Sequence, residues 1–411
     1  MNTNDAYAAM RIRDFRFFVF ARFLLTFAIQ MQSVIVGWQI YHLTHDAFSL
    51  GLIGLTEAIP FLSVALFAGH AADNINRKKI ILVSYIIYFV CAFILFTVAS
   101  DFLPAVTKLG IIPIYTTIFI SGLTRAFIFP AQAAFAAQIV PKELFGNAST
   151  WNSVFWQFAA VSGPAAGGLL VGFMGFSPAY FCVVCLTVVS TVFVIFVKSR
   201  PLPERAEKES MIKSLKTGLK FVFSNQIILS AVSLDMFAVF FGGAVTMLPL
   251  FADQVLHTGA KGLGFLRAAP AVGAIIMSLI QAYYPPFKKA GRNLLIAVAL
   301  YGISIICFAI SQSFYLSLIL LAIGGMFDNI SVIVRGTLIQ VYTPDELRGR
   351  VSAVNGIFIG SSNELGSFES GVAAKLLGLI PSVIFGGTMT ILVVSGITKF
   401  APKLRKLSLI S

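Results

Sequence analysis

Nine ionisable side chains lie inside long apolar runs of this sequence, and they are the residues whose chemistry needs an explanation. They are Arg22, Glu57, Arg125, Asp235, Arg267, Asp328, Arg335, Glu364 and Glu369. A charge at the depth of a bilayer costs at least about 2.5–3.5 kcal/mol, so each group needs a partner, a cavity or a function. Arg22 lies near the end of its run, where a long side chain can reach the membrane surface, and we expect a structural role for it.

An internal repeat matches acids to bases among these residues. A shift of 203 positions aligns Arg125 with Asp328, and a shift of 210 positions aligns Glu57 with Arg267. Because a helix rises about 1.5 Å per residue, the members of each expected pair lie at similar depths. We predict the ion pairs Glu57–Arg125 and Arg267–Asp328, with Asp328–Arg335 as a further pairing. The two interpretations are a titrating network along a pathway and static pairs that hold helices together.

Three further carboxyl groups have no predicted partner. Asp235 has no base at a matching depth, and an unpaired carboxyl group in apolar surroundings favours its protonated form. Proton coupling requires that property. Glu364 and Glu369 are five residues apart, which is about 140° around a helix, so we expect at most one of them to face the same cavity.

Polar and aromatic side chains in the same runs could line the route of a small molecule. The candidates are Gln30, Gln32, Trp38, Gln39, Asn152, Trp156, Gln157, Asn329 and Asn363. For any single one of them, a hydrogen bond between helices is the alternative role.

Other residue patterns give little support for metal, redox or hydrolytic chemistry. Cys182 and Cys185 form a C-x-x-C pair, but no histidine or acidic residue lies near it, and helix packing explains it. His42, His45 and Asp46 could bind a metal only from a loop. No histidine lies deep within a predicted span, since His70 is at the inner end of the second one, and no GxxxxGK[ST] stretch occurs, so we predict no enzyme, no metal, no cofactor and no ATP-driven step.

The composition of the chain requires a membrane. Of its 411 residues, 58% are apolar and 11% are charged, whereas about 25% are charged in soluble proteins. The polar opening runs directly into an apolar stretch, so we expect no cleaved signal segment. At about 20 apolar residues per crossing, twelve spans are predicted, at 15–41, 49–73, 78–100, 111–138, 142–173, 178–197, 223–253, 260–284, 291–311, 314–341, 346–375 and 379–400.

The basic residues outside these spans gather on alternate loops. An even number of spans places both ends on one side of the membrane. The basic clusters at 11–16, 77–79, 198–220, 288–292 and 399–406 then predict that both termini are cytoplasmic. Topology thus accounts for the net charge of +13, and we expect no nucleic-acid partner.

The longest polar stretch, residues 198–222, divides the chain into two similar halves. We predict six-helix bundles at 1–197 and 223–411, joined by a cytoplasmic linker at 198–222. Two such halves, related by an axis along the membrane normal, are typical of proteins whose central cavity opens alternately to each side.

The second part of this linker has the pattern of an amphipathic helix. Apolar residues at 211, 215, 219 and 222 alternate with Lys213, Lys216 and Lys220. A helix on the anionic inner leaflet and a solvated charged linker are the two interpretations.

Two motifs resemble those of the major facilitator superfamily. Residues 69–79, GHAADNINRKK, are similar to its G-x-x-x-D-x-x-x-R-K loop motif; the matching positions are Gly69, Asp73, Arg77 and Lys78. Residues 159–168, AAVSGPAAGG, resemble its helix-5 antiporter motif, with Ala159 in place of the first glycine; the matching positions are Gly163, Pro164, Gly167 and Gly168. Glycines four residues apart also allow two helices to approach closely.

Three longer stretches indicate which subfamily of the superfamily the sequence resembles. Residues 234–256, 262–274 and 343–356 are similar to the subfamily that contains enterobactin exporters and macrolide efflux proteins. Arg125 falls where such exporters carry a helix-4 arginine implicated in proton coupling, although no Gln-Gly follows it here.

The resemblance implies an all-α integral membrane protein with twelve transmembrane helices in two pseudo-symmetric bundles, the major facilitator fold. It further implies a proton-coupled antiporter in the bacterial inner membrane that exports a small amphipathic or siderophore-like compound by alternating access. The alternative is an uncoupled facilitator or lysophospholipid-type translocase, with the charged residues as structural pairs. The expected partners are a small-molecule substrate, protons and the lipid bilayer, and the expected state is a monomer.

Overall fold

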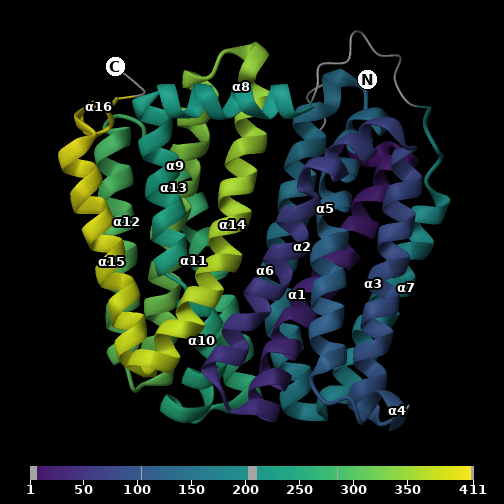
Figure 1. Cartoon of the computed structure of the whole chain (residues 1–411). Coiled ribbons are helices and arrows are strands. Elements are labelled where there is room, and N and C mark those ends of the chain that lie inside the picture. Colours follow the sequence, from purple (N-terminus) through teal and green to yellow (C-terminus); the bar gives the residue numbers. More distant parts are fainter. Residues whose placement is uncertain (1–6, 103, 202–210, 285, 409–411) are drawn as a thin grey trace. The chain divides into compact units, whose positions relative to one another are not determined.

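A computed structural model describes residues 7–102, 104–201, 211–284 and 286–408 of the protein, and within them the regular structure is helical (Figure 1). The long helices of the first half are α1 (Arg13–Thr44), α2 (Ala47–Asn74), α3 (Arg77–Ser100), α5 (Ile112–Ile139), α6 (Phe145–Met174) and α7 (Phe176–Phe196). Those of the second half are α8 (Met211–Ser224), α9 (Gln226–Phe241), α11 (Gly259–Tyr283), α12 (Ala290–Ile310), α13 (Phe314–Tyr342), α14 (Asp345–Leu377) and α15 (Leu379–Phe400). The short helices include α4 (Pro104–Thr107), α10 (Ala244–Leu250) and α16 (Pro402–Arg405).

Eleven of the described helical segments are long and apolar enough to cross a membrane. The remaining predicted span, at 346–375, coincides with α14, whose 33 residues exceed the roughly 20 that a crossing needs. This helix is more polar than the others because residues such as Asn363, Glu364 and Glu369 recur along it. The all-helical fold with twelve spans that the sequence predicts is therefore confirmed.

The seventh predicted span, at 223–253, is present as Gln226–Val255, and the structure adds an interruption within it. Helix α9 ends before Gly242 and Gly243, and the chain continues as α10 and a π-helical turn over Phe251–Val255. The hydroxyl of Tyr301 donates a hydrogen bond to the carbonyl oxygen of Gly242 at 3.1 Å. That bond satisfies a backbone group at the break, as an apolar environment requires.

The chain forms two compact units, Met1–Leu43 with Thr56–Lys208 and Thr44–Leu55 with Glu209–Ser411. They differ from the predicted halves because the first turns of α2 pack with the second unit. A Cβ atom on Gly51 would lie 2.8 Å from the Cα atom of Gly371 in α14. The absence of side chains at these glycines thus lets the start of α2 lie directly against α14.

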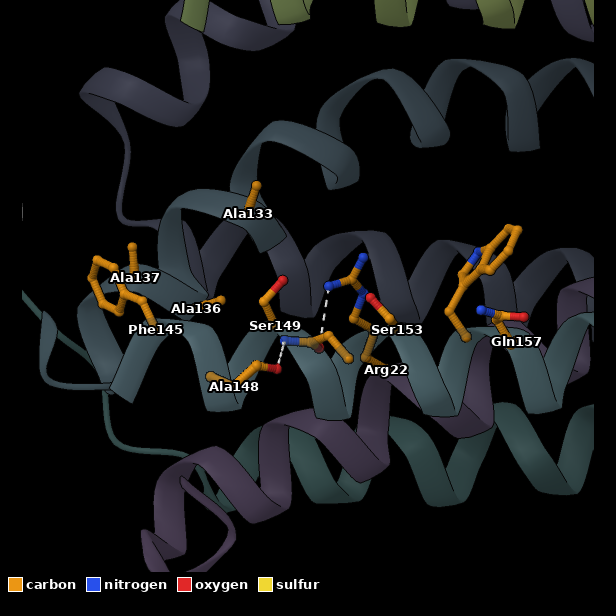
Figure 2. A pocket seen from close by; sticks show the side chains of 11 residues that line it. Arg22, Ala133, Ala136, Ala137, Phe145, Ala148, Ser149, Ser153 and Gln157 are labelled. Atoms are coloured by element: carbon orange, nitrogen blue, oxygen red, sulfur yellow. Dashed lines mark hydrogen bonds between the residues drawn. The ribbon is translucent and has the colours of Figure 1, made fainter. Parts of the chain in front are cut away.

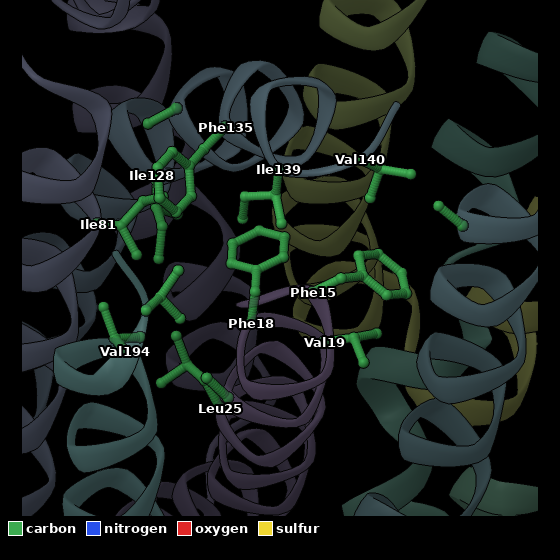
Figure 3. Close-up of a cluster of buried hydrophobic side chains, with 14 of the residues drawn as sticks. Phe15, Phe18, Val19, Leu25, Ile81, Ile128, Phe135, Ile139, Val140 and Val194 are labelled. Carbon is green, nitrogen blue, oxygen red and sulfur yellow. The ribbon is translucent and has the colours of Figure 1, made fainter. Parts of the chain in front are cut away.

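The core of the first unit is built around the first half of α1. Buried aromatic and aliphatic side chains from four helices meet there (Figure 3): Phe15, Phe18, Val19 and Leu25 of α1, Ile81 of α3, Ile128, Phe135 and Ile139 of α5, and Val194 of α7. Helix α6 approaches α1 through its glycines. A Cβ atom on Gly163 would lie 2.8 Å from that of Gln30, and one on Gly167 would lie 2.6 Å from the carbonyl oxygen of Met31.

The core of the second unit is centred on α13, which packs against α11 and α12. Gly325 of α13 lies directly against the backbone of Pro270 in α11, and Gly273 of α11 lies against the backbone of Ala322 in α13. Because both helices present glycine where they meet, their backbones come closer than side chains would permit.

Helix α8 packs its apolar side against protein. In Figure 1 it runs crosswise over the end of α14. Leu215, Leu219 and Val222 join a buried cluster with Val351 and Val354 of α14. Val222 is buried there, whereas Leu215 and Leu219 are partly buried, so the apolar side of α8 packs at least in part against α14, and the two interpretations of this segment stay predictions.

Candidate functional site

The first unit contains the predicted ion pair Glu57–Arg125. The distance between Arg125 Nη1 and Glu57 Oε1 is 2.5 Å, and each side chain is 25% exposed. Helices α2 and α5 bring the two groups together where Gly122 lies against the backbone of Glu57. The guanidinium also lies 4.9 Å from the ring centroid of Phe61, in a cation–π contact. The prediction of this pair is confirmed.

The second unit has a different pair from the one predicted. Arg335 of α13 forms an ion pair with Asp235 of α9, and their side chains are only 6% and 7% exposed. The prediction that Asp235 has no partner was therefore wrong. Arg335 lies seven residues before the end of α13 and Asp235 nine residues after the start of α9. At about 1.5 Å per residue the two depths match, so the sequence did contain this signal.

Arg267 and Asp328 are not joined, so the predicted pair Arg267–Asp328 was wrong, as was the further pairing Asp328–Arg335. Neither Arg267 nor Asp328 takes part in an ion pair within the described ranges. The Nε atom of Arg267 is buried without a hydrogen-bond partner there. Similar depth on two helices was not sufficient for Arg267 and Asp328, because the direction of each side chain depends on how the helices pack.

The two glutamates of α14 have separate surroundings. The hydroxyl of Ser370 lies 3.5 Å from Glu369 Oε2, and the backbone of Glu364 lies against Gly54 of α2. Asn363 donates a hydrogen bond to the carbonyl oxygen of Ile359 within the same helix. The roles of these three residues in a pathway stay predictions.

Several predicted lining residues form hydrogen bonds between helices. Gln39 of α1 is buried and accepts a hydrogen bond from the hydroxyl of Tyr180 in α7 at 2.6 Å. Asn329 of α13 accepts hydrogen bonds from Ser278 and Gln281 of α11, both at 3.2 Å. The alternative role of interhelical bonding therefore applies to Gln39 and Asn329.

Three other predicted lining residues, Asn152, Trp156 and Gln157, line a cavity of about 600 Å³ in the first unit. Helix α6 contributes them together with Ser149 and Ser153, whereas α5 contributes only alanines, and Arg22 enters from α1 (Figure 2). Trp38 is buried against Tyr41 instead, and Gln32 is not among the residues that line this cavity.

Arg22 is the functional candidate that the sequence reasoning missed. Its Nη1 atom donates a hydrogen bond to Asn152 Oδ1 at 3.3 Å, and Asn152 in turn donates to the carbonyl oxygen of Ala148 (Figure 2). The side chain lines the cavity. An arginine nine residues into a long apolar helix, without an acid at its depth, was the signal that could have identified it.

The loop motif places two cations on helix ends. Arg77 donates to the carbonyl oxygens of Ala72 and Ala134, both at 3.3 Å, and Lys78 donates to that of Ile195 at 2.9 Å. Ala72 and Ile195 lie in the last turns of α2 and α7, where cations are favoured by the helix dipole. The side chain of Asp73 lies outside the described part, and the gating role of the motif stays a prediction.

Asp46 caps the start of α2. Its carboxylate accepts hydrogen bonds from the backbone N–H and the hydroxyl of Ser49, both at 3.0 Å. Partial burial alone would raise the pKa of Asp46. The bonds from Ser49, a bond from the backbone of Phe48 and the charge of Lys375 outweigh it and hold the pKa below its usual value.

Replacing Asp46 by alanine is expected to lower stability by about 1 kcal/mol through loss of the cap. Asparagine also caps helices, so Asp46→Asn should retain most of the stability but not its titration. Because the folded-state pKa is lowered, the carboxylate's contribution is present above the unfolded-state pKa of about 3.9 and lost as the pH falls through the folded-state value. In thermal unfolding in detergent, the wild type should be more stable than Asp46→Asn, and this difference in stability should become smaller below pH 4. A difference that stays constant with pH would contradict the role of the Asp46 carboxylate as the cap.

Known proteins are similar to this chain over most of its length. A family model described as Major Facilitator Superfamily matches residues 18–367. The chain is 24% identical over 341 residues to the enterobactin exporter EntS of Shigella dysenteriae serotype 1, covering 83% of this chain and 80% of that protein. The same values hold for EntS of Escherichia coli O1:K1 / APEC.

Solved structures share the fold. A POT family transporter in complex with 5-aminolevulinic acid matches with a TM-score of 0.74 at 13% identity, covering 96% of this chain and 97% of that one. A bacterial homolog to the human lysosomal transporter Spinster, in an occupied conformation, matches with a TM-score of 0.73 at 14% identity, covering 96% and 98%. At these identities the likeness establishes the fold alone.

Proposed function

Because the chain belongs to the major facilitator superfamily, we propose that it is a proton-coupled antiporter that exports a small amphipathic or siderophore-like compound by alternating access. The protein is a transporter and not an enzyme, and it is a multi-pass protein of the bacterial inner membrane. We further propose that it works as a monomer with both termini in the cytoplasm. The positive loops support that orientation.

The observation that carries proton coupling is the carboxyl group of Asp328. It lies on α13 midway between Phe314 and Tyr342, the two ends of a helix that can span the membrane. Its side chain is partly buried and has no ion pair in the described part of the chain. A carboxyl group at that depth is stable when protonated and needs water to ionise, so its proton release can be linked to the opening of a water-filled path.

The direction of transport and the class of substrate rest on other observations. The relatives at 24% identity are named enterobactin exporters, which supports export of a siderophore-like compound. The cavity beside Arg22 lies within the size range of small-molecule sites, about 300–1,000 Å³. The close contacts of Gly163 and Gly167 with α1 support a rigid helix pair of the kind that moves as one body.

The proposal is tested with purified protein in liposomes that enclose a pH-sensitive dye. Addition of enterobactin should change the internal pH, and an uncoupler should abolish concentrative uptake of radiolabelled enterobactin. Asp328→Asn should remove the coupled pH change but leave exchange of labelled for unlabelled enterobactin intact. The control Asp253→Asn makes the same chemical change at an exposed position and should retain coupling.

The alternative of an uncoupled facilitator or lysophospholipid-type translocase is favoured by the two ion pairs. Glu57–Arg125 and Asp235–Arg335 are formed in this structure, as static structural pairs would be. If the flux of enterobactin or of a labelled lysophospholipid is unchanged both by the uncoupler and by Asp328→Asn, the facilitator hypothesis is correct and the antiporter hypothesis is wrong.

A further inference from the structure

The cavity in the first unit carries one ionisable side chain. Arg22 enters from α1, and every other lining residue is uncharged. The guanidinium group is partly buried in a helix that can span the membrane. A buried positive charge is destabilising unless a negative charge or several hydrogen bonds compensate for it.

The protein compensates for only part of this charge. One hydrogen bond from Nη1 reaches the neutral amide of Asn152, whereas a guanidinium has five N–H donors. Within the described ranges no carboxylate forms an ion pair with Arg22. The nearby phenol of Tyr85 accepts a hydrogen bond from Gln132 at 3.3 Å. The remaining donors of Arg22 are therefore available to a ligand in the cavity.

The other walls of the cavity favour a flat apolar group next to that charge. Trp156 and Phe145 line it, and their side chains are 52% and 40% exposed. Opposite α6, the wall formed by α5 carries only Ala133, Ala136 and Ala137, which leave room for a ring system (Figure 2). Ser149, Ser153 and Gln157 add hydrogen-bonding groups to the wall that α6 forms, and Ser149 and Ser153 lie nearer to the arginine than Gln157 does (Figure 2).

We propose that this cavity binds an aromatic carboxylate, with Arg22 holding the carboxylate group and Trp156 contacting the ring. Guanidinium and carboxylate match in geometry and can form two parallel hydrogen bonds. The inference rests on the proposed function, because it specifies one class of ligand among the small amphipathic compounds that the transporter is proposed to export. It assigns to Arg22 a role in substrate selection, in place of the structural role expected from the sequence.

The test measures binding of two probes to the purified full-length protein in detergent by titration calorimetry. The probes 1-naphthoate and 1-naphthamide share a ring system and differ in the charge of one group. The wild type should bind naphthoate about tenfold more tightly or better, because a hydrogen bond to a charged group contributes about 1.5–3 kcal/mol. Arg22→Gln should reduce this ratio to about one, and Arg22→Lys, which keeps the charge as a point cation, should retain part of it.

Two controls separate the site from general effects. Arg292→Gln removes the same charge from an exposed position on α12 and should leave the ratio unchanged. Trp156→Leu should weaken both probes by a similar factor while keeping the preference for the anion. Each variant is first shown to unfold at a temperature close to that of the wild type.

The result that overturns the inference is equal binding of the two probes to the wild type, or a preference that persists in Arg22→Gln. These outcomes are distinct from failure of the proposed function. If naphthoate binding depends on Arg22 but flux is insensitive to an uncoupler, the proposal of proton coupling is wrong and the proposed carboxylate site stands. If flux is driven by protons but binding does not depend on Arg22, the proposed carboxylate site is wrong and the proposal of proton coupling stands.

Discussion

Replacement of Arg335 by leucine is expected to destabilise the folded protein by about 3–5 kcal/mol, because it leaves a buried carboxylate without its counter-ion. Asp235 is only 5% exposed, and Arg335 is the residue that pairs with it. Either the charge of Asp235 stays uncompensated or the carboxyl group takes up a proton, and both lower the stability of the native state at neutral pH. Unfolding by sodium dodecyl sulfate in mixed micelles measures the loss.

A double-mutant cycle distinguishes this cause from simple loss of packing. If the unpaired charge is responsible, Asp235→Leu combined with Arg335→Leu should be considerably more stable than Arg335→Leu alone, since apolar replacement of a whole buried pair is often close to neutral. Arg292→Leu, at an exposed site of α12, should change stability by no more than about 0.5 kcal/mol. Additive effects of the two single changes would contradict the buried pair.

Replacement of Gly325 by alanine is expected to destabilise the protein by about 1–3 kcal/mol, against the normal preference of helices for alanine. A Cβ atom at this position of α13 would overlap the carbonyl group of Pro270 in α11. Because the obstacle is backbone, it cannot rotate away, and α11 and α13 must move apart. The same unfolding measurement detects the change.

Gly336 supplies a control on the same helix. Apart from its chain neighbours and the backbone of its own helix, no atom of the described residues lies within 4 Å of a Cβ atom built there, so Gly336→Ala should stabilise the protein by about 0.5–1 kcal/mol. The two substitutions are chemically identical and are expected to have opposite signs. Equal effects at the two positions would show that the close approach of α11 to α13 is absent.

The amino-acid sequence by itself determined the class of fold and most of the spans. Apolar runs of about 20 residues and the distribution of basic loops are local properties, and each can be read without knowing what a helix packs against. Glu57–Arg125 was also predictable, because the rise of about 1.5 Å per residue places both charges at similar depths on neighbouring helices. The break in the seventh span was not predicted from the sequence, because Gly242 and Gly243 leave the hydropathy of that span unchanged.

Only the tertiary structure decided which charges meet. Arg335 pairs across two helices with Asp235, whereas Asp328, seven residues away on the same helix α13 and so about 10 Å away along its axis, stays apart. The packing of helices that are distant in the sequence also places Arg22 in a cavity and brings the apolar side of α8 against α14. Hydropathy and spacing define how deep a side chain lies, but its direction depends on the packing of distant helices, which the one-dimensional pattern does not encode.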